Sequence, residues 1–373
     1  MKILFLTNHL NGNDGYSRYS LGFIREIQTS GHQALVLTSQ KSHETIKEYV
    51  VLAKPLKYLA NPLRIFLTSI KVKKAIKDFS PDIIHFMAEP YVNLLPFLGN
   101  IKAKTYLTCH GTYSVIPNLI NNFLKKRISQ FLAIRYFHKL TNIITVSNYT
   151  KSYLLKYYPE ISPKTKVITN GIDLEENQLM GLDKKPKNEI KKILFVGAVK
   201  KRKGILEAIE ACRHYRDNFS SNFIYDIIGD YDENSDYYQN LLNKIKEYGL
   251  ENNILFRGRV IDKELEEYYS NADLFLMPSI NVDYNFEGFG LVFLEANNKG
   301  VPCIGSKDSG SQDAILEEKT GYLVDPFDFK KIAQKIDLIL NQNSIKRENC
   351  LTWAKQNDIK IKVKELLNFY QAL

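Results

Sequence analysis

Cysteine, tryptophan and long apolar runs are scarce in this chain of 373 residues, which contains four Cys and one Trp. The cysteines are scattered, without the paired spacing of a zinc site or a disulfide framework, so we expect a reducing, cytoplasmic setting. No stretch approaches the roughly 20 apolar residues that span a bilayer. The opening run MKILFLTNHL is too short for a signal peptide and predicts a first strand.

Apolar and aromatic residues are plentiful, at 44% and 12% of the chain, and they indicate a fully folded protein. A chain of this length is too long for one ordinary core and suits two domains of about 150–200 residues each.

The net charge of +10 is concentrated in one half of the chain. Residues 1–185 carry 25 Lys and Arg against 12 Asp and Glu, a net +13, whereas residues 186–373 carry 26 against 29, a net −3. A basic half attracts anionic partners such as an acidic substrate or an anionic membrane surface. An AT-rich genome that encodes many lysines is the alternative, but it does not explain why the excess lies in one half. No nucleic-acid-binding module is recognisable, so we expect no nucleic acid partner.

Short apolar runs alternate with amphipathic segments in both halves, and helices are expected at Tyr16–Thr29 and Pro62–Phe79. Nearly continuous apolar strands separated by helices indicate parallel sheets covered on both faces. Two such series predict an α/β protein with two doubly wound, Rossmann-like domains, joined within the polar stretch 174–190. Strands are expected at 2–8, 33–39, 83–89, 103–110, 142–147, 166–169, 191–197, 223–230, 253–260, 273–279, 301–306 and 321–324.

The segment NFEGFGLVFLEANNKGVPCIGS, residues 285–306, places two glutamates eight positions apart around the glycine pair Gly288 and Gly290. Gly288 and Gly290 permit close backbone approach. The run Leu291–Asn298 predicts a helix whose N-terminal amides suit a phosphate.

The two glutamates flank this predicted phosphate cradle. Glu287, in the loop, is suited to accept hydrogen bonds from sugar hydroxyls. Glu295 lies about two turns into the helix, about the reach from a diphosphate to a ribose. The pattern therefore favours a nucleotide-sugar. The E-x7-E spacing alone is weak evidence, however, because either acid could simply be a solvated surface residue.

The block EGFGLVFLEANNKGVPCIGS resembles glycosyltransferase family 4, whose members are retaining enzymes with the GT-B fold. The motifs NGNDGYSRYS, PDIIHFM, CHGTY, ITVSNYT, ITNGID, FVGAVKKRKG, FRGRV, LFLMPS and TGYLVDP occur in the family's order and extend over nearly the whole chain. The resemblance implies an acceptor-binding domain over 1–185, a nucleotide-sugar-binding domain over 186–355, and a C-terminal helix over 356–373 that packs back toward the N-terminal domain. It also implies a cleft between two facing domains.

The resemblance assigns roles around the nucleotide-sugar donor. Glu287 would contact the sugar and Glu295 the ribose hydroxyls. Lys203 matches a lysine that neutralises the leaving diphosphate. Further donor contacts are expected at Gly15, Arg202, Val260, Gly288, Phe289, Gly290, Leu291 and Val292.

The chain departs from the family pattern at Ala198 and matches it at His110. The family often has an arginine where this chain has Ala198. Either Lys200, Lys201 or Arg202 compensates for it, or the donor binds differently. His110 matches a histidine near the reacting centre and would bind the sugar or position the acceptor, although a lone histidine at a strand end can equally be structural.

The implied reaction is hexosyl transfer from a nucleotide-sugar, UDP-linked by preference and GDP-mannose next, to a glycan, lipid-linked or other anionic acceptor of a bacterial surface polysaccharide or glycolipid. No cofactor and no metal are expected, because the Asp-x-Asp of GDYDENSD (229–236) is more typical of a polar loop. The basic amphipathic segments 56–79 and 118–140 could place the protein peripherally on the inner face of the cytoplasmic membrane, or could be ordinary packed helices. A small soluble acceptor and a catalytically idle scaffold remain alternatives.

Overall fold

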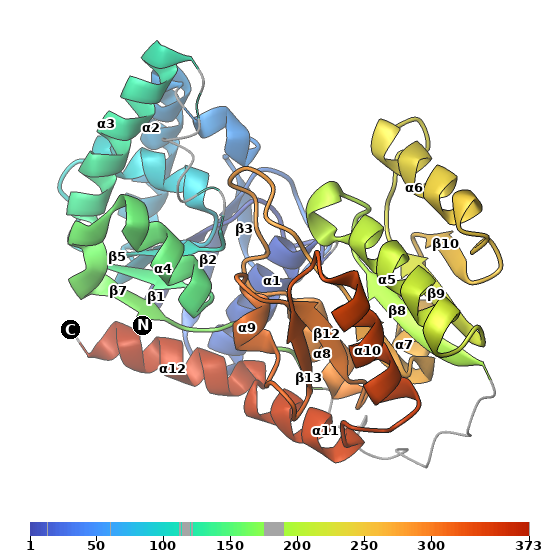
Figure 1. Ribbon diagram of the computed structural model, residues 1–373. Helices are drawn as coiled ribbons and strands as arrows, with labels where there is room; N and C mark the ends of the chain where they lie inside the picture. The colour runs from blue at the N-terminus through green and yellow to red at the C-terminus, as the bar shows by residue number, and fades with distance from the viewer. Residues whose placement is uncertain are drawn as a thin grey trace. The chain divides into compact units, whose positions relative to one another are not determined.

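The computed structural model describes residues 1–12, 14–59, 61–111, 113, 120, 122–174 and 190–372. The chain forms two compact units (Figure 1), one made of Met1–Asp173 with Ile359–Leu373 and the other of Leu174–Asp358. We call them unit 1 and unit 2. The expected domain boundary after residue 185 lies outside the described residues.

Unit 1 contains a parallel seven-stranded sheet in the order β3-β2-β1-β4-β5-β6-β7. Its strands are β1 (Lys2–Leu6), β2 (Gln33–Thr38), β3 (Glu48–Val50), β4 (Ile83–Phe86), β5 (Lys104–Cys109), β6 (Asn142–Thr145) and β7 (Thr165–Val167). Its α-helices are α1 (Gly15–Thr29), α2 (Pro62–Phe79), α3 (Phe123–Lys139), α4 (Asn148–Tyr157) and α12 (Ile359–Gln371), and its 3-10 helices are η1 (Pro55–Tyr58), η2 (Glu89–Phe97) and η4 (Pro159–Lys164).

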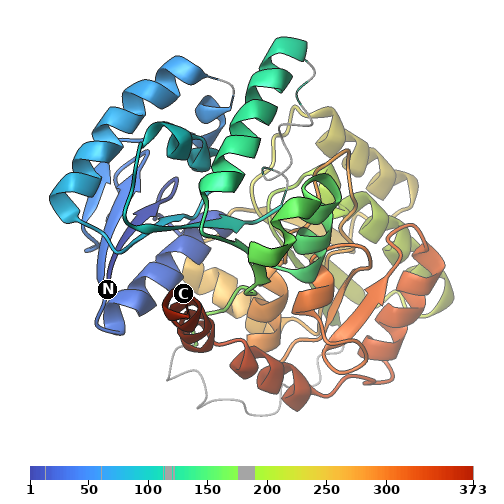
Figure 2. The same cartoon turned by 90° about the vertical axis from the view of Figure 1, so that its left-hand side faces the viewer.

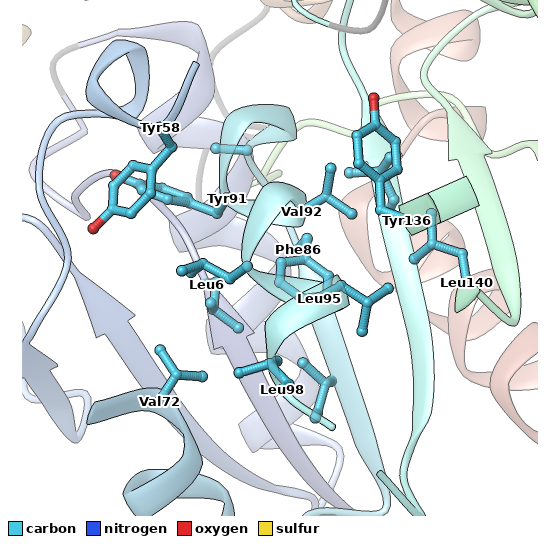
Figure 3. Packing of buried hydrophobic residues seen from close by; sticks show 14 of the residues in the cluster. Leu6, Tyr58, Val72, Phe86, Tyr91, Val92, Leu95, Leu98, Tyr136 and Leu140 are labelled. Carbon is cyan, nitrogen blue, oxygen red and sulfur yellow. The ribbon is translucent and has the colours of Figure 1, made fainter. Parts of the chain in front are cut away.

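The strands of unit 1 bury both faces because alternate side chains point to opposite sides. Leu4 and Leu6 of β1 join a core with α2, η2 and α3, part of which is drawn in Figure 3. Ile3 and Phe5 join a second core with α1 and α12. The sheet is therefore a middle layer between two layers of helices.

The start of α2 shows how local sequence sets the helix ends. Asn61 caps the helix by accepting from the Arg64 backbone N–H, and Pro62 occupies the first turn, where its missing N–H costs nothing. The helix ends at Ser80, which is left-handed at φ 49°. The prediction of a helix over Pro62–Phe79 is confirmed.

Helix α12 returns to unit 1 from the far end of the chain and packs on α1 (Figures 1 and 2). A Cβ at Gly171 would lie 2.7 Å from the Ile359 Cα, so only glycine lets the chain pass here. At its other end Tyr370 bonds a fully buried histidine: its hydroxyl lies 2.5 Å from His85 Nδ1, and His85 Nε2 lies 2.7 Å from Thr108 Oγ1. Burial and the neighbouring His110 lower the pKa of His85 to about 3, so His85 is neutral at physiological pH.

Unit 2 contains a parallel six-stranded sheet in the order β10-β9-β8-β11-β12-β13. The strands are β8 (Lys191–Val196), β9 (Phe223–Ile228), β10 (Ile254–Gly258), β11 (Leu274–Leu276), β12 (Cys303–Ser306) and β13 (Gly321–Val324). The helices are α5 (Ile205–Asn218), α6 (Asp236–Glu247), α7 (Asp262–Asn271), α8 (Leu291–Asn298), α9 (Ser311–Ala314), α10 (Phe329–Leu340), α11 (Arg347–Gln356) and the 3-10 helix η6 (Lys201–Lys203).

The two predicted strand series are confirmed, with differences at their ends. Most strands are shorter than the apolar runs, because the last residues of each run form the turns beyond the carboxyl edge. The structure adds β3, a short edge strand that was not predicted. Among the described residues no helix is long and apolar enough to cross a membrane.

Candidate functional site

The loop between β11 and α8 ends in a turn that depends on glycine. Gly290 has φ +83°, and a Cβ on it would lie 2.6 Å from the ring of Phe293. Within the described residues no side chain caps α8, which begins at Leu291 with Gly290 as its N-cap. Its first-turn amides can therefore donate to an anion.

A second glycine holds this loop against its neighbour. Gly310 donates its backbone N–H to the Glu287 carbonyl at 2.7 Å. A Cβ at Gly310 would lie 2.0 Å from the Gly288 carbonyl oxygen. Gly310 thus fixes the backbone around Glu287 and Gly288.

Glu287 forms the centre of a buried charge cluster. Its Oε2 accepts from Lys203 Nζ at 2.6 Å and from Arg202 Nη1 at 2.9 Å. Burial alone would raise the pKa of this carboxyl, but Lys203 and Arg202 outweigh burial and lower it to about 2. Burial lowers the pKa of Lys203, while Glu287 opposes that shift. The cluster holds two cations beside one carboxylate, an excess of positive charge.

The two cations, Arg202 and Lys203, both lie in η6, and the turn that follows η6 fixes their position. Gly204 has φ +71°, and a Cβ there would lie 1.8 Å from the Pro278 carbonyl oxygen. Arg202 is tied to the same segment, because its carbonyl accepts from the Ile280 N–H at 2.9 Å. The close contact that glycine allows therefore brings η6 to the end of β11.

The half-buried Ala198 lies just beyond β8, at the position where family 4 often has arginine. Its neighbour Val199 donates to the Asp230 carbonyl at 2.9 Å. Of the three residues considered as replacements for that arginine, Arg202 contacts Glu287, whereas Lys200 and Lys201 are exposed.

Glu295 lies on α8 only one turn beyond Leu291, not the expected two, because the helix begins at Leu291; it is half-buried. The buried Tyr269 of α7 donates its hydroxyl to Glu295 Oε2 at 2.7 Å. This bond fixes one oxygen of the carboxylate in space. Sequence reasoning missed Tyr269, since no local motif marks it.

Val260 follows β10 and is partly exposed. The turn before it contains Gly258 at φ +69°, and Arg257 Nε donates to the buried carboxylate of Asp226 at 2.7 Å. These contacts fix the backbone at the carboxyl end of β10.

The remaining two expected site residues, Gly15 and His110, belong to unit 1. Gly15 is the first residue of α1, which Asp14 caps by accepting from the Ser17 N–H at 2.8 Å. Among the residues that the structure describes, none would lie within 4 Å of a Cβ at Gly15.

His110 follows β5 and is held by groups that the sequence did not link to it. Its Nε2 lies 3.0 Å from the Met87 carbonyl oxygen, and its ring packs against Tyr16 and Tyr19 at 4.6 Å between centroids. Since a carbonyl only accepts, Nε2 carries the proton and Nδ1 is the acceptor nitrogen. Burial lowers the pKa of His110 to about 4, against the raising effects of the Met87 bond and Asp14. His110 is therefore neutral at physiological pH.

Glu89, the first residue of η2, is a buried acid that sequence reasoning missed. Its Oε1 accepts from the backbone N–H of His110 at 2.7 Å and of Gly111 at 3.3 Å. Its Oε2 lies 3.5 Å from the Tyr16 hydroxyl. Glu89 thus fixes the turn that carries His110.

Within the described part of the chain, no group of three or more His, Cys, Asp or Glu side chains could hold a metal ion. The structure joins Glu287, Lys203 and Arg202 in one cluster beside the start of α8. Glu295 and Val260 lie elsewhere in the same unit.

Comparison with known proteins identifies the family. The family model described as Glycosyltransferase Family 4 matches residues 13–176, and the one described as Glycosyl transferases group 1 matches residues 182–357. The chain belongs to glycosyltransferase family 4. The resemblance that its motifs suggested is confirmed.

This family 4 glycosyltransferase has relatives among proteins of bacterial capsule regions. It is 29% identical over 319 residues to a 41.2 kDa protein in the cps region of Klebsiella pneumoniae, covering 82% of this chain and 81% of that protein. It is 28% identical over 240 residues to the capsular polysaccharide biosynthesis glycosyltransferase CapM of Staphylococcus aureus, covering 60% of this chain and 57% of CapM.

Solved structures support the fold of this glycosyltransferase. Anabaena HepE in complex with UDP matches it with a TM-score of 0.77 at 19% identity, over 100% of both chains. The structural neighbours of this chain are GT-B glycosyltransferases, so the expected α/β fold of GT-B type is confirmed.

Proposed function

We propose that this glycosyltransferase moves a hexose from a nucleotide-sugar to a glycan or glycolipid acceptor in the synthesis of a bacterial surface polysaccharide or glycolipid. The observation that carries the proposal is the buried cluster of Lys203 and Arg202 on Glu287, beside the uncapped start of α8. The capsular relatives favour a polysaccharide product, and the UDP bound to Anabaena HepE favours a UDP-sugar, with GDP-mannose next.

The donor diphosphate would bind at the start of α8. The amides of the loop and first turn, Gly288 to Val292, would donate to its oxygens. Lys203 and Arg202 would turn from Glu287 to the phosphates, so that positive charge meets the anion that forms as the sugar departs. Glu287 would then be free to accept hydrogen bonds from hydroxyls of the hexose.

The nucleoside would be held farther along the same unit. Glu295 would accept hydrogen bonds from the ribose hydroxyls, with Tyr269 keeping its carboxylate oriented. The backbone around Val260 would contact the base. The family motif also assigns Gly15 to the donor phosphates.

We infer a retaining reaction on one face of the sugar. The bond from the anomeric carbon to the diphosphate oxygen breaks, the acceptor oxygen bonds to that carbon from the same face, and the acceptor's proton passes to the leaving diphosphate. Lys203 and Arg202 would supply the counter-charge to the diphosphate, so we expect turnover without an added metal. Neutral His110, with Nδ1 as its acceptor atom, would position the sugar or the acceptor hydroxyl rather than donate a proton.

The direct test is a binding and hydrolysis panel with UDP-, GDP- and ADP-sugars on the full chain. We expect one donor to raise the melting temperature and to be slowly hydrolysed, and chelator should leave the rate unchanged. Turnover of a small soluble acceptor would favour the narrower alternative of a small-molecule transferase. Failure to bind or turn over any donor would refute the proposal and leave a scaffold role.

A further inference from the structure

Helix α2 of unit 1 is apolar on two opposite faces. Ile65, Thr68, Ser69, Val72 and Ala75 are buried against the sheet and η2. At about 100° per residue, the opposite side of the helix is centred near residue 70.

That outward side carries large apolar side chains at helical spacing. Leu63, Phe66, Leu67 and Ile70 recur at intervals of three, one and three, and each is between 51% and 69% exposed. The sheet and η2 already occupy the buried side, so this second apolar face requires a separate explanation.

Helix α3 has the same construction. Its buried residues include Leu132, Ala133 and Tyr136, while on the outward side Phe123 and Leu124 are 71% and 67% exposed. Phe131 and Ile134, on the outward side too, are 54% and 53% exposed.

Basic side chains accompany both apolar faces. Arg127 lies over the Phe123 ring at 5.3 Å and Arg135 over the Phe131 ring at 4.1 Å. The sequence of α2 contains five Lys or Arg and one acid, Asp78, and that of α3 contains five Lys or Arg and no acid. In the next turns of α2 the exposed Lys73, Lys74 and Lys77 follow the apolar residues.

Both helices begin at the same edge of unit 1. Figures 1 and 2 show the N-terminal ends of α2 and α3 at one end of the unit. Crossover helices run antiparallel to their strands, so this end is the carboxyl edge of the sheet, where His110 follows β5. Both helices pack on η2, whose first residue is Glu89 beneath His110.

We propose that the outward faces of α2 and α3 dock unit 1 on an anionic lipid bilayer. The apolar side chains enter the boundary between headgroups and acyl chains, and the lysines and arginines pair with anionic headgroups. A lipid is favoured over a second copy of this chain, because two faces with ten basic residues and one acid would repel each other. Resting on the proposed function, this surface assigns the acceptor to a lipid-linked glycan presented beside His110.

The test is flotation of the full chain with vesicles of phosphatidylglycerol and phosphatidylethanolamine, and with vesicles of phosphatidylcholine alone. We expect binding to the first and little to the second. The variant Leu63→Ser/Phe66→Ser/Leu67→Ser should weaken binding at least a hundred-fold, since each deeply buried side chain contributes about ten-fold or more. The matched control Phe327→Ser/Ile361→Ser, which removes two apolar residues that are 62% and 50% exposed elsewhere, should bind normally.

A second variant tests the charges. Lys73→Gln/Lys74→Gln/Lys77→Gln should weaken binding to phosphatidylglycerol vesicles about a hundred-fold, from about five-fold per lysine. All these side chains are exposed, so unchanged melting temperatures will exclude misfolding.

Equal binding to both vesicle types, or no binding to either, would overturn the proposal. So would a dimer in sedimentation that the triple serine variant dissociates, because a second copy would then cover these faces. The flotation assay contains no donor, so its failure is distinguishable from failure of the donor panel.

Discussion

Replacing Lys203 by methionine separates the structural from the catalytic contribution of the buried cluster. Methionine keeps the apolar stem and removes the ammonium that lies 2.6 Å from Glu287 Oε2. Glu287 retains Arg202 at 2.9 Å. We therefore expect a loss of unfolding free energy of about 1–3 kcal/mol, below the roughly 3–5 kcal/mol for a buried charge left without any partner.

The pKa of Glu287 leads to a free energy of similar size. Its pKa falls from an ordinary 4.5 to about 2 in the folded protein. A lowered pKa contributes stability that is present above pH about 4.5 and is lost as the pH falls toward 2. A shift of this size corresponds to about 3 kcal/mol, and the burial of Lys203 offsets part of it. Lys203→Met should reduce this acid-sensitive stability.

Turnover should respond differently from stability. Loss of one cation facing the leaving diphosphate is expected to lower kcat by about 10²–10³-fold. In the double variant Lys203→Met/Glu287→Gln no buried carboxylate remains, and Arg202, whose side chain is 32% exposed, can be hydrated. Stability should therefore recover to within about 1 kcal/mol while turnover stays low.

Denaturant unfolding and donor-hydrolysis rates, measured on the single and double variants, test this reasoning. Lys200→Met is the matched control, because Lys200 is exposed in the same loop and should change neither quantity. Near-normal turnover of Lys203→Met, or a double variant no more stable than the single one, would refute it.

Three further predictions concern other parts of the site. Glu295→Ala should weaken UDP binding about 10–100-fold by titration calorimetry, whereas Tyr269→Phe should weaken it less. A Glu295→Ala variant that binds UDP as tightly as the unmodified chain would remove the ribose assignment. Tyr370→Phe should lower the unfolding free energy by about 1–3 kcal/mol, because it leaves a buried His85 nitrogen without its partner; an unchanged denaturation midpoint would contradict this. Glu89→Gln keeps the side-chain shape but weakens the two hydrogen bonds that the side chain accepts from backbone amides, so KM for the acceptor should rise while UDP affinity stays constant. A change in UDP affinity alone would argue against a role on the acceptor side.

The parts of the structure that local sequence encodes were predictable. The amphipathic pattern predicted α2 over Pro62–Phe79, and the run after Gly288 and Gly290 predicted α8 over Leu291–Asn298. Lys203 was assigned a position on the diphosphate through the family motif, and the structure places it on Glu287.

Contacts between distant segments were not predictable in the same way. Glu89 ends an apolar run and carries no local sign that it will accept two amides from the turn after β5. Tyr269 and Tyr370 are ordinary members of apolar helix faces until the fold brings them to Glu295 and His85. Strand ends were overestimated because apolar residues continue past the last ladder bond into the loops.

The proposed function depends most on where the donor diphosphate binds, and a crystal structure of the full chain with UDP measures this directly. We expect the diphosphate on the amides of Leu291 and Val292, Lys203 Nζ moved from Glu287 to a phosphate oxygen, and the ribose on Glu295. UDP bound at another place, with the Lys203–Glu287 pair still closed, would contradict it.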